Sequence, residues 1–293
     1  MARGDRFFHF PTHKLYDRPE EHGLVYESVF FDSRDGVRLH AWFFPAVGDV
    51  REPSLTRPTD PGSATVRRRA KGTVVHCHGN AGNITGHYRF VAWLPKRGWN
   101  VLCFDYRGYG ESQGRATRQG TLLDTHAAID YVRTRDEVDP SRIVLFGQSL
   151  GGVVGIVAAA QRDDLAALAV EGAFAGYQQE ALFVCRNTWW LWGAAGLVSR
   201  WFVASGCDAI DYIDRIGSIP KLFMCGTEDG IVDYRQTLAL HQRACDPKEL
   251  WVLDGNGHTE ALIDDEPDQQ YPQMTRRDRF CRFLQDSVDG SDR

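Results

Sequence analysis

Long hydrophobic runs are absent from this sequence of 293 residues. No stretch approaches the about 18 to 20 uninterrupted apolar residues that a helix needs to span a bilayer. The first ten residues also lack the apolar core and cleavage site of a secretory signal, because charged residues precede only the short aromatic cluster Phe7 to Phe10. We therefore expect no transmembrane segment and, as the default, a cytoplasmic location.

Paired cysteine signatures are missing as well. The seven cysteines are odd in number and include no CxxC pair. Cys77, Cys103 and Cys225 fall in apolar runs that look like buried strands. Cys185 and Cys207 flank a tryptophan-rich segment and could meet, but buried reduced thiols fit the pattern better. This cysteine usage agrees with a cytoplasmic location.

A one-sided excess of charge is also lacking. The net charge is -5 and both signs are interspersed, whereas nucleic-acid binding generally needs a basic face. The run Arg67 to Arg69 lies in the stretch Val47 to Lys71, whose prolines and glycines indicate a long solvated connection. We expect no nucleic-acid partner and, from the length and ordinary composition, one large α/β domain.

The order of apolar runs predicts a mostly parallel sheet. From Gly72 onward, short apolar runs alternate with amphipathic stretches, as in βα units. Before it, Asp-Gly within Ser33 to Gly36 joins two β-branched and aromatic runs, which predicts an antiparallel hairpin. No repeat of fixed period is visible, so a solenoid or propeller is not expected. The expected strands are Tyr26–Asp32, Val37–Phe44, Thr73–His76, Trp99–Phe104, Arg142–Phe146, Leu165–Val170, Lys221–Cys225 and Glu249–Leu253, and the expected helices are Tyr88–Arg97, Arg118–Arg135, Ser149–Gln161, Tyr234–Arg243 and Tyr271–Asp286.

One serine stands at a predicted strand-to-helix turn. Gly147-Gln148-Ser149-Leu150-Gly151 follows the apolar run Arg142 to Phe146 and precedes the helical stretch from Gly152 to Ala160. A nucleophile elbow needs such a sharp turn, with glycines on both sides of a strained serine. The setting predicts Ser149 as a nucleophile and the N–H of Leu150 as one donor of an oxyanion hole.

Candidates for an acid and a base follow this serine in the chain. A serine hydroxyl needs a base that takes its proton, and an imidazole base needs a carboxylate to hold it. Asp229, after an apolar strand, is the candidate acid; the adjacent Glu228 stays open, and Glu171 at the end of another strand is a less favoured substitute. His258 follows the final strand, and glycine on either side of Asn256 lets its loop fold back over the serine.

The second oxyanion donor is assigned to the run His76 to Asn83, which follows the first buried strand. We assign the backbone N–H of Asn80, with His78-Gly79 shaping the turn. A metal site begun by His76 and His78 would need further ligands at suitable spacing, and a phosphate cradle would need the lysine and Ser/Thr of a P-loop. We therefore expect no metal ion.

One stretch, Gly176 to Arg215, interrupts the βα alternation. It is too long for a simple βα connection and too apolar for an idle loop, so we expect a small helical cap over the active site. Some of its aromatic residues would only pack the cap onto the sheet. The cap residues expected to face a substrate are Trp189, Trp190, Trp192 and Trp201.

The domain organisation follows from these assignments. Residues 1–25 form an N-terminal extension, and residues 26–293 form a single domain with the cap, residues 176–215, as an insertion. His9, His13 and His22 are expected to precede the folded core.

With these pieces in order, the chain resembles the α/β-hydrolase superfamily of serine hydrolases. The runs His78-Gly79-Asn80-Ala81-Gly82-Asn83 and Phe104-Asp105-Tyr106-Arg107-Gly108-Tyr109-Gly110-Glu111-Ser112 look like the branch that includes eukaryotic depalmitoylase-like hydrolase-domain proteins and bacterial relatives. The resemblance runs from about Tyr26 to the C-terminus. It implies an eight-stranded, mostly parallel sheet flanked by helices, with the second strand antiparallel, and a triad of Ser149, Asp229 and His258 without a cofactor.

The chemistry predicted is acyl transfer. The apolar cap favours a small-molecule or lipid-like substrate with a hydrophobic acyl or aromatic group, so a carboxylesterase or acyl thioesterase is the first hypothesis. A peptidase of the same fold is the enzymatic alternative. The alternative from another class is a non-catalytic binding or signalling protein, in peripheral contact with a membrane through Phe7 to Phe10.

Overall fold

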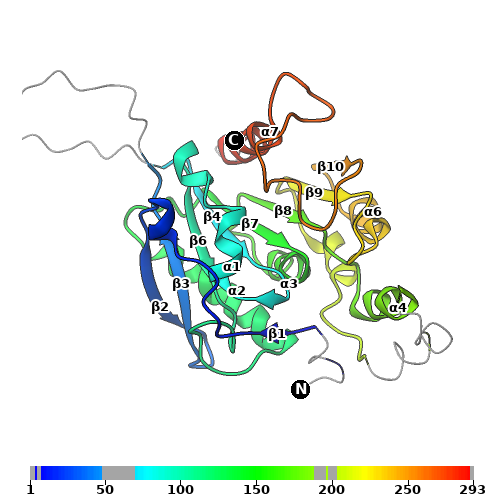
Figure 1. The fold of residues 1–293 in the computed structure, drawn as a ribbon, viewed down its shortest axis with the longest axis horizontal. Coiled ribbons are helices and arrows are strands. Elements are labelled where there is room, and N and C mark those ends of the chain that lie inside the picture. Colours follow the sequence, from blue (N-terminus) through cyan, green and yellow to red (C-terminus); the bar gives the residue numbers. More distant parts are fainter. Residues whose placement is uncertain (1–3, 5–7, 48–69, 188–195, 197–202, 291–293) are drawn as a thin grey trace, which may run out of the picture.

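The computed structural model describes residues 4, 8–47, 70–187, 196 and 203–290. At its centre lies a sheet of eight strands in the spatial order β10-β9-β8-β7-β4-β6-β3-β2 (Figure 1). Strand β3 runs antiparallel to both of its neighbours, and every other pair in this sheet is parallel. The mostly parallel sheet with an antiparallel second strand is thus confirmed. The eight strands are β2 (Glu27–Asp32), β3 (Arg38–Phe44), β4 (Thr73–Cys77), β6 (Asn100–Phe104), β7 (Ile143–Gln148), β8 (Ala167–Glu171), β9 (Lys221–Gly226) and β10 (Lys248–Leu253).

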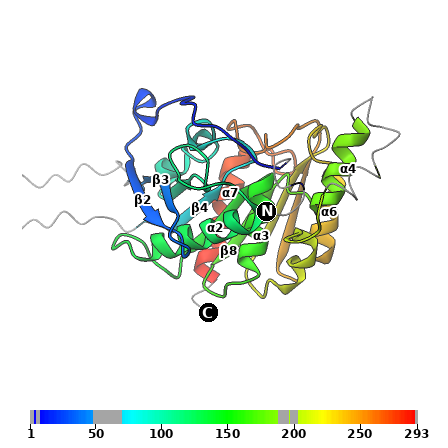
Figure 2. The same ribbon diagram turned by 90° about the horizontal axis from the view of Figure 1, so that it is seen from below.

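Helices cover both faces of the sheet. Side chains alternate along a strand, so Leu145 of β7 packs in the cluster that includes Val153 of α3, while its neighbour Phe146 packs in the cluster that includes Phe280 of α7. Figure 2 shows α2 and α3 on one side of the sheet and α7 on the other. Because both faces are buried, the central strands are apolar along their length. The longer helices are α2 (Arg118–Arg133), α3 (Leu150–Ala159), α4 (Tyr177–Asn187), α6 (Tyr234–Arg243) and α7 (Arg276–Gly290).

One predicted helix is wrong. The stretch 88–97 forms two 3-10 helices, Tyr88–Phe90 and Leu94–Arg97, preceded by the short helix α1 (Ile84–His87). The side chain of Asn83 caps α1, and Pro95 begins a new turn because it has no N–H to donate. The last helix also starts later than predicted: α7 begins at Arg276, whereas the expected helix begins at Tyr271.

Residues 8–11 of the N-terminal segment pack on the domain, so the expectation that His9 precedes the folded core is wrong, whereas His13 and His22 are exposed. Phe8 is buried, and its ring meets that of Tyr177 edge to face, with 4.9 Å between the centroids. His9 is buried as well. The next two residues form β1 (Phe10–Pro11), which pairs in parallel with β5 (Ala81–Gly82) as a separate two-stranded sheet. The start of the chain therefore contacts the loop that contains Asn80.

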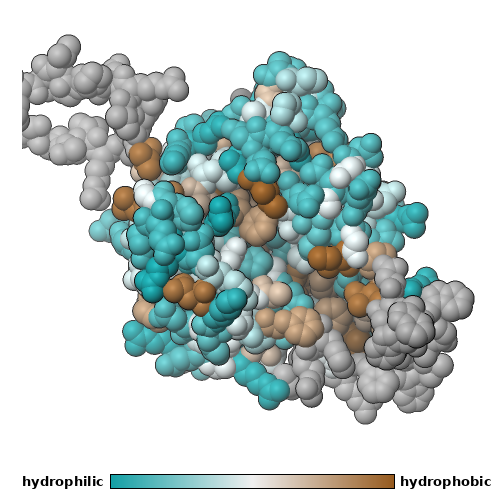
Figure 3. Space-filling model, in the orientation of Figure 1, coloured by the Kyte–Doolittle hydropathy of each residue, from teal (hydrophilic) through white to brown (hydrophobic). Residues whose placement is uncertain are grey.

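The surface is mostly hydrophilic on the face shown in Figure 3, with apolar side chains in separate small patches. Within the described ranges, the structure contains no helix that combines the length and the apolar character needed to cross a membrane. The cytoplasmic location remains a prediction.

Candidate active site

Ser149 occupies a strained turn between β7 and α3. Its backbone angles are φ 54° and ψ -120°, a region that residues other than glycine rarely adopt, at a cost of about 1 to 3 kcal/mol. The N–H of Ser149 donates to the carbonyl of Glu171 on the neighbouring strand, 2.8 Å away. The two glycines of the motif are needed for space: a Cβ on Gly147 would lie 2.3 Å from the Gly151 carbonyl oxygen. The turn has the geometry expected of a nucleophile elbow.

Gly151→Ala tests this crowding. An added Cβ would lie 2.0 Å from the carbonyl oxygen of Cys77, so the turn must shift, and we expect the free energy of unfolding to fall by about 1 to 3 kcal/mol or more in a urea titration. Gly155→Ala in the same helix is the control, because its Cβ would meet Leu145 at an ordinary 3.6 Å. Equal unfolding midpoints for the two variants would contradict the argument.

His258 and Asp229 are in direct contact. The ring nitrogen Nδ1 of His258 lies 2.6 Å from Oδ2 of Asp229. The other carboxylate oxygen accepts the N–H groups of Ile231, at 2.9 Å, and of Val232, at 2.8 Å. Asp229 can thus accept from His258 only through Oδ2, with Nδ1 of His258 as the donor. The structure thus brings together the two residues predicted as acid and base, whereas the Glu171 carboxylate contacts Gln148 and Ala261.

Gly172 connects the serine to this pair. It directly follows Glu171, whose carbonyl takes the Ser149 N–H. A Cβ on Gly172 would lie 3.1 Å from Cε1 of His258 and 3.5 Å from Oδ2 of Asp229, so the glycine leaves room for the pair. The structure brings His258 and Asp229 together and links Ser149 to them through the Glu171-Gly172 segment.

The loop after β4 lies beside the serine. A Cβ on Gly79 would be 3.6 Å from the Cβ of Ser149. The Gly79 carbonyl lies 2.7 Å from Nδ1 of His78, and the Asn80 carbonyl accepts the hydroxyl of Tyr109 at 2.7 Å. These contacts fix the peptides on both sides of Asn80. The other assigned N–H, that of Leu150, lies at the first turn of α3, where backbone N–H groups have no partner within the helix.

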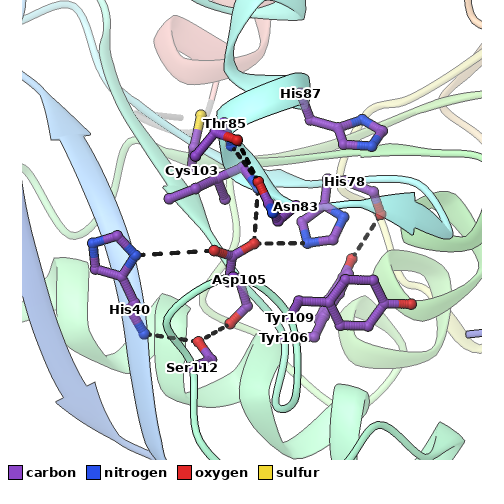
Figure 4. A network of polar contacts seen from close by, with 12 residues as sticks. His40, His78, Asn83, Thr85, His87, Cys103, Asp105, Tyr106, Tyr109 and Ser112 are labelled. Carbon is purple, nitrogen blue, oxygen red and sulfur yellow. Dashed lines mark hydrogen bonds and ion pairs between the residues drawn. The ribbon is translucent and has the colours of Figure 1, made fainter. Parts of the chain in front are cut away.

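Asp105 lies beneath this loop and was not singled out as a functional residue from the sequence. Figure 4 shows its carboxylate between His40 and His78, 3.9 and 3.6 Å from their ring nitrogens. Oδ1 also accepts the N–H of Ile84 at 2.8 Å. Burial raises the pKa of Asp105 and lowers the pKa of His78 well below its usual value. Since Tyr106 also donates to the His78 carbonyl, the two motifs that carried the resemblance are in contact.

Comparisons with known proteins agree with this architecture. The sequence model of the family described as "Serine aminopeptidase, S33" matches residues 68–216. The chain belongs to this family of α/β-hydrolases.

Named relatives of this α/β-hydrolase come from bacteria and plants. The uncharacterized protein YfhR of Escherichia coli O157:H7 is 34% identical over 270 residues, which are 92% of this chain and 84% of that protein. The alpha/beta hydrolase domain-containing protein WAV2 of Arabidopsis thaliana is 34% identical over 220 residues, 73% of this chain and 65% of that protein. Among solved structures, the esterase Pf2001 of Pyrococcus furiosus superimposes with a TM-score of 0.69 at 21% identity, covering 96% of this chain and 98% of that one, a likeness in fold.

The expected cap of the α/β-hydrolase is described in part. Helix α4 begins at Tyr177, and the 3-10 helices Ala209–Asp211 and Ile213–Arg215 lie near the end of the insertion. Glu180 of α4 is buried, and its carboxylate accepts a hydrogen bond from Gln236 at 2.7 Å. The four cap residues expected to face a substrate, Trp189, Trp190, Trp192 and Trp201, lie outside the described residues.

Glu180 predicts a pH dependence of stability. Burial raises its pKa from the ordinary 4.5 to about 7, against the hydrogen bond from Gln236 that lowers it. Between pH 4.5 and 7 the folded protein retains a proton that the unfolded chain has released, so stability falls as the pH rises through this window. Glu180→Gln removes this component, and its free energy of unfolding relative to wild type should rise by about 2 to 3 kcal/mol from pH 4.5 to 7.5 in urea titrations. Parallel pH curves for the two proteins would contradict the prediction.

Proposed function

We propose that this α/β-hydrolase is a serine hydrolase that cleaves carboxylic esters or thioesters through an acyl-enzyme. The observation that carries the proposal is the 2.6 Å contact between His258 and a buried Asp229, whose second oxygen is already occupied by backbone N–H groups. A carboxylate held in this way orients an imidazole with its other nitrogen free to accept a proton. Ser149, in its strained turn, is the group whose proton it would take.

The proposed reaction has two steps. His258 takes the Ser149 proton as Oγ bonds to the substrate carbonyl carbon, and the oxyanion is held by the N–H groups of Asn80 and Leu150. The leaving alcohol or thiol departs with the proton from His258. Water then attacks the acyl-enzyme in the same manner, releasing the carboxylic acid and restoring Ser149. Asp229 stabilises the imidazolium in both steps. The proposed reaction requires no metal ion or organic cofactor.

A hydrophobic acyl or aromatic group is the proposed substrate feature. Ile231, two residues after Asp229, is 57% exposed, so an apolar side chain flanks the acid. The segment 176–215 is proposed as the cap over the site, and its composition is strongly apolar. The two motifs that pack together below Asn80 support placement in the branch of depalmitoylase-like hydrolase-domain proteins, and a lipid-like acyl chain would suit that branch.

A peptidase is the second candidate, because the matched family carries the description of a serine aminopeptidase. The two candidates share the triad chemistry and differ in the leaving group: both leaving groups take the proton from His258, but an amine is the poorer leaving group and depends more strongly on that protonation.

Turnover of p-nitrophenyl esters of increasing acyl length, beside aminoacyl p-nitroanilides, tests both candidates. We expect ester hydrolysis whose kcat/KM rises with acyl length up to the size of the pocket, and little anilide hydrolysis. Faster turnover of the anilides would favour the peptidase. A folded protein that turns over neither class and fails to react with a fluorophosphonate probe would favour a binding role.

A further inference from the structure

Glu171 has a buried carboxylate that joins two segments of the candidate site. It ends β8 and is 2% exposed. Its Oε2 accepts a hydrogen bond from Nε2 of Gln148, the residue before Ser149, at 2.8 Å. Its Oε1 accepts the backbone N–H of Ala261, three residues after His258, at 2.7 Å. One side chain therefore contacts both the nucleophile elbow and the loop that carries the histidine.

Both segments contain a residue in the left-handed region. Ser149 has φ 54°, and Thr259, directly after His258, has φ 56°. Such conformations in residues other than glycine cost about 1 to 3 kcal/mol each and persist only where the surroundings hold them. The Glu171 carboxylate accepts one hydrogen bond from the segment that contains Ser149 and one from the segment that contains Thr259. Its own carbonyl accepts the Ser149 N–H, so main chain and side chain act together.

The carboxylate continues into a chain of buried polar groups. Oε1 of Gln148 lies 3.0 Å from Nε2 of His76, whose Nδ1 lies 3.9 Å from the sulfur of Cys103. With Glu171 as an acceptor, the amide of Gln148 must turn its NH₂ toward Glu171 and its oxygen toward His76. The orientation of the Gln148 amide, and with it the group that faces Nε2 of His76, follows from Glu171 acting as an acceptor.

We propose that Glu171 is a positioning residue, which holds Ser149 and His258 in register by accepting from Gln148 and Ala261. This inference rests on the proposed function, because it assigns a role in placing the same two groups. Glu171 touches neither substrate nor reacting atoms. Loss of its carboxylate should thus lower kcat and leave KM nearly unchanged, since misplacement of a catalytic group by about 1 Å costs on the order of 100-fold in rate.

Two variants of Glu171 distinguish a positioning role of its carboxylate from simple filling of the buried space. Glu171→Leu removes both acceptors, and we expect kcat for a p-nitrophenyl ester to fall about 100-fold with KM within about threefold. Glu171→Gln can keep both contacts: its oxygen accepts from Ala261, its NH₂ donates to Gln148, and the Gln148 amide turns over so that its NH₂ donates to His76. We expect kcat of Glu171→Gln to stay within about tenfold of wild type.

Asp268→Leu is the matched control for stability. Asp268 is equally buried, accepts the N–H groups of Gln270 and Tyr271 at 2.9 and 2.8 Å, and pairs with Arg279 at 3.2 Å, but none of these contacts involves Ser149 or His258. We expect this variant to unfold at a lower temperature with kcat unchanged below its transition.

Should Glu171→Leu not fold, Gln148→Leu removes one of the two contacts and is expected to lower kcat about tenfold.

The outcomes are distinct. A Glu171→Leu protein, or in its place Gln148→Leu, with the kcat of wild type would overturn the positioning role while leaving the hydrolase function intact. A loss of kcat equal to that of Asp268→Leu at the same loss of stability would also overturn it. An inactive wild-type protein that does not react with a fluorophosphonate would overturn the proposed function itself, and the assignment of Glu171 with it.

Discussion

Replacing Ser149 with alanine is expected to lower kcat for p-nitrophenyl esters by about 10⁶-fold and to abolish labelling by a fluorophosphonate probe. The hydroxyl oxygen is the only heavy atom removed, so the proposed oxyanion donors and the His258–Asp229 contact remain in place. A residual rate above that of water is expected from those donors alone. The backbone of the turn should remain, because alanine has the same Cβ as serine and meets the same strain.

Ser141→Ala is the control for this experiment. Ser141 precedes β7, at the opposite end of the strand from Ser149, and its hydroxyl donates to Asp139. It should label and turn over ester as the wild type does. Probe labelling that persists in the Ser149→Ala protein would mean that another residue is the nucleophile.

The second large effect is expected for Asp229→Asn, at about 10⁴-fold in kcat. The two N–H groups of Ile231 and Val232 point at Oδ1 and cannot reverse, so the asparagine must place its oxygen there. Its NH₂ then faces Nδ1 of His258, which has to become an acceptor. The ring proton moves to the other nitrogen, the one needed to take the proton of Ser149. The geometry of the site survives while the tautomer is wrong.

Measurement against pH tests this explanation. The Asp229→Asn protein should recover activity at high pH, where hydroxide can remove the serine proton without the imidazole. Asp233→Asn is the control: Asp233 caps α6 by accepting the N–H of Arg235, and asparagine caps a helix about as well. Wild-type kcat in the Asp229→Asn protein would show that this carboxylate does not set the tautomer of His258.

The strands could be predicted from the sequence because each is a short apolar run next to a turn signal. Helix α6 was predicted with its observed bounds, since its apolar spacing and the cap at Asp233 are local features. The prediction of one helix over 88–97 is wrong because of Pro95: the apolar pattern continues through this residue, but proline has no backbone N–H to donate a helical hydrogen bond. The pairing of β1 with β5 had no local signal: two residues in parallel contact depend on where the sheet places the loop at Ala81.

In the candidate site, too, features with a local sequence motif could be predicted, and contacts between distant segments could not. The elbow at Ser149 and the loops that carry Asp229 and His258 have recognisable motifs, so they could be predicted. The partners of Glu171 could not, because Gln148 and Ala261 meet it only after β7, β8 and the histidine loop are assembled. The position of Glu171 at a strand end suggested a substitute acid, whereas its contacts support the proposed role of a positioning residue. A carboxylate in the sequence carries no sign of which groups it will accept from.

The two ends of the described chain differ as places to attach a purification tag. Phe8 packs against Tyr177, and the N–H of Phe10 donates to the side chain of Asn80, so residues 8–10 lie against the loop that contains the proposed oxyanion donor. Helix α7 ends at Gly290, and Asp289 pairs with Arg142, which precedes β7 at the end of that strand opposite to Ser149. We expect a tag at the C-terminus to disturb enzyme assays less than a tag at the N-terminus, because the end of α7 lies away from Ser149.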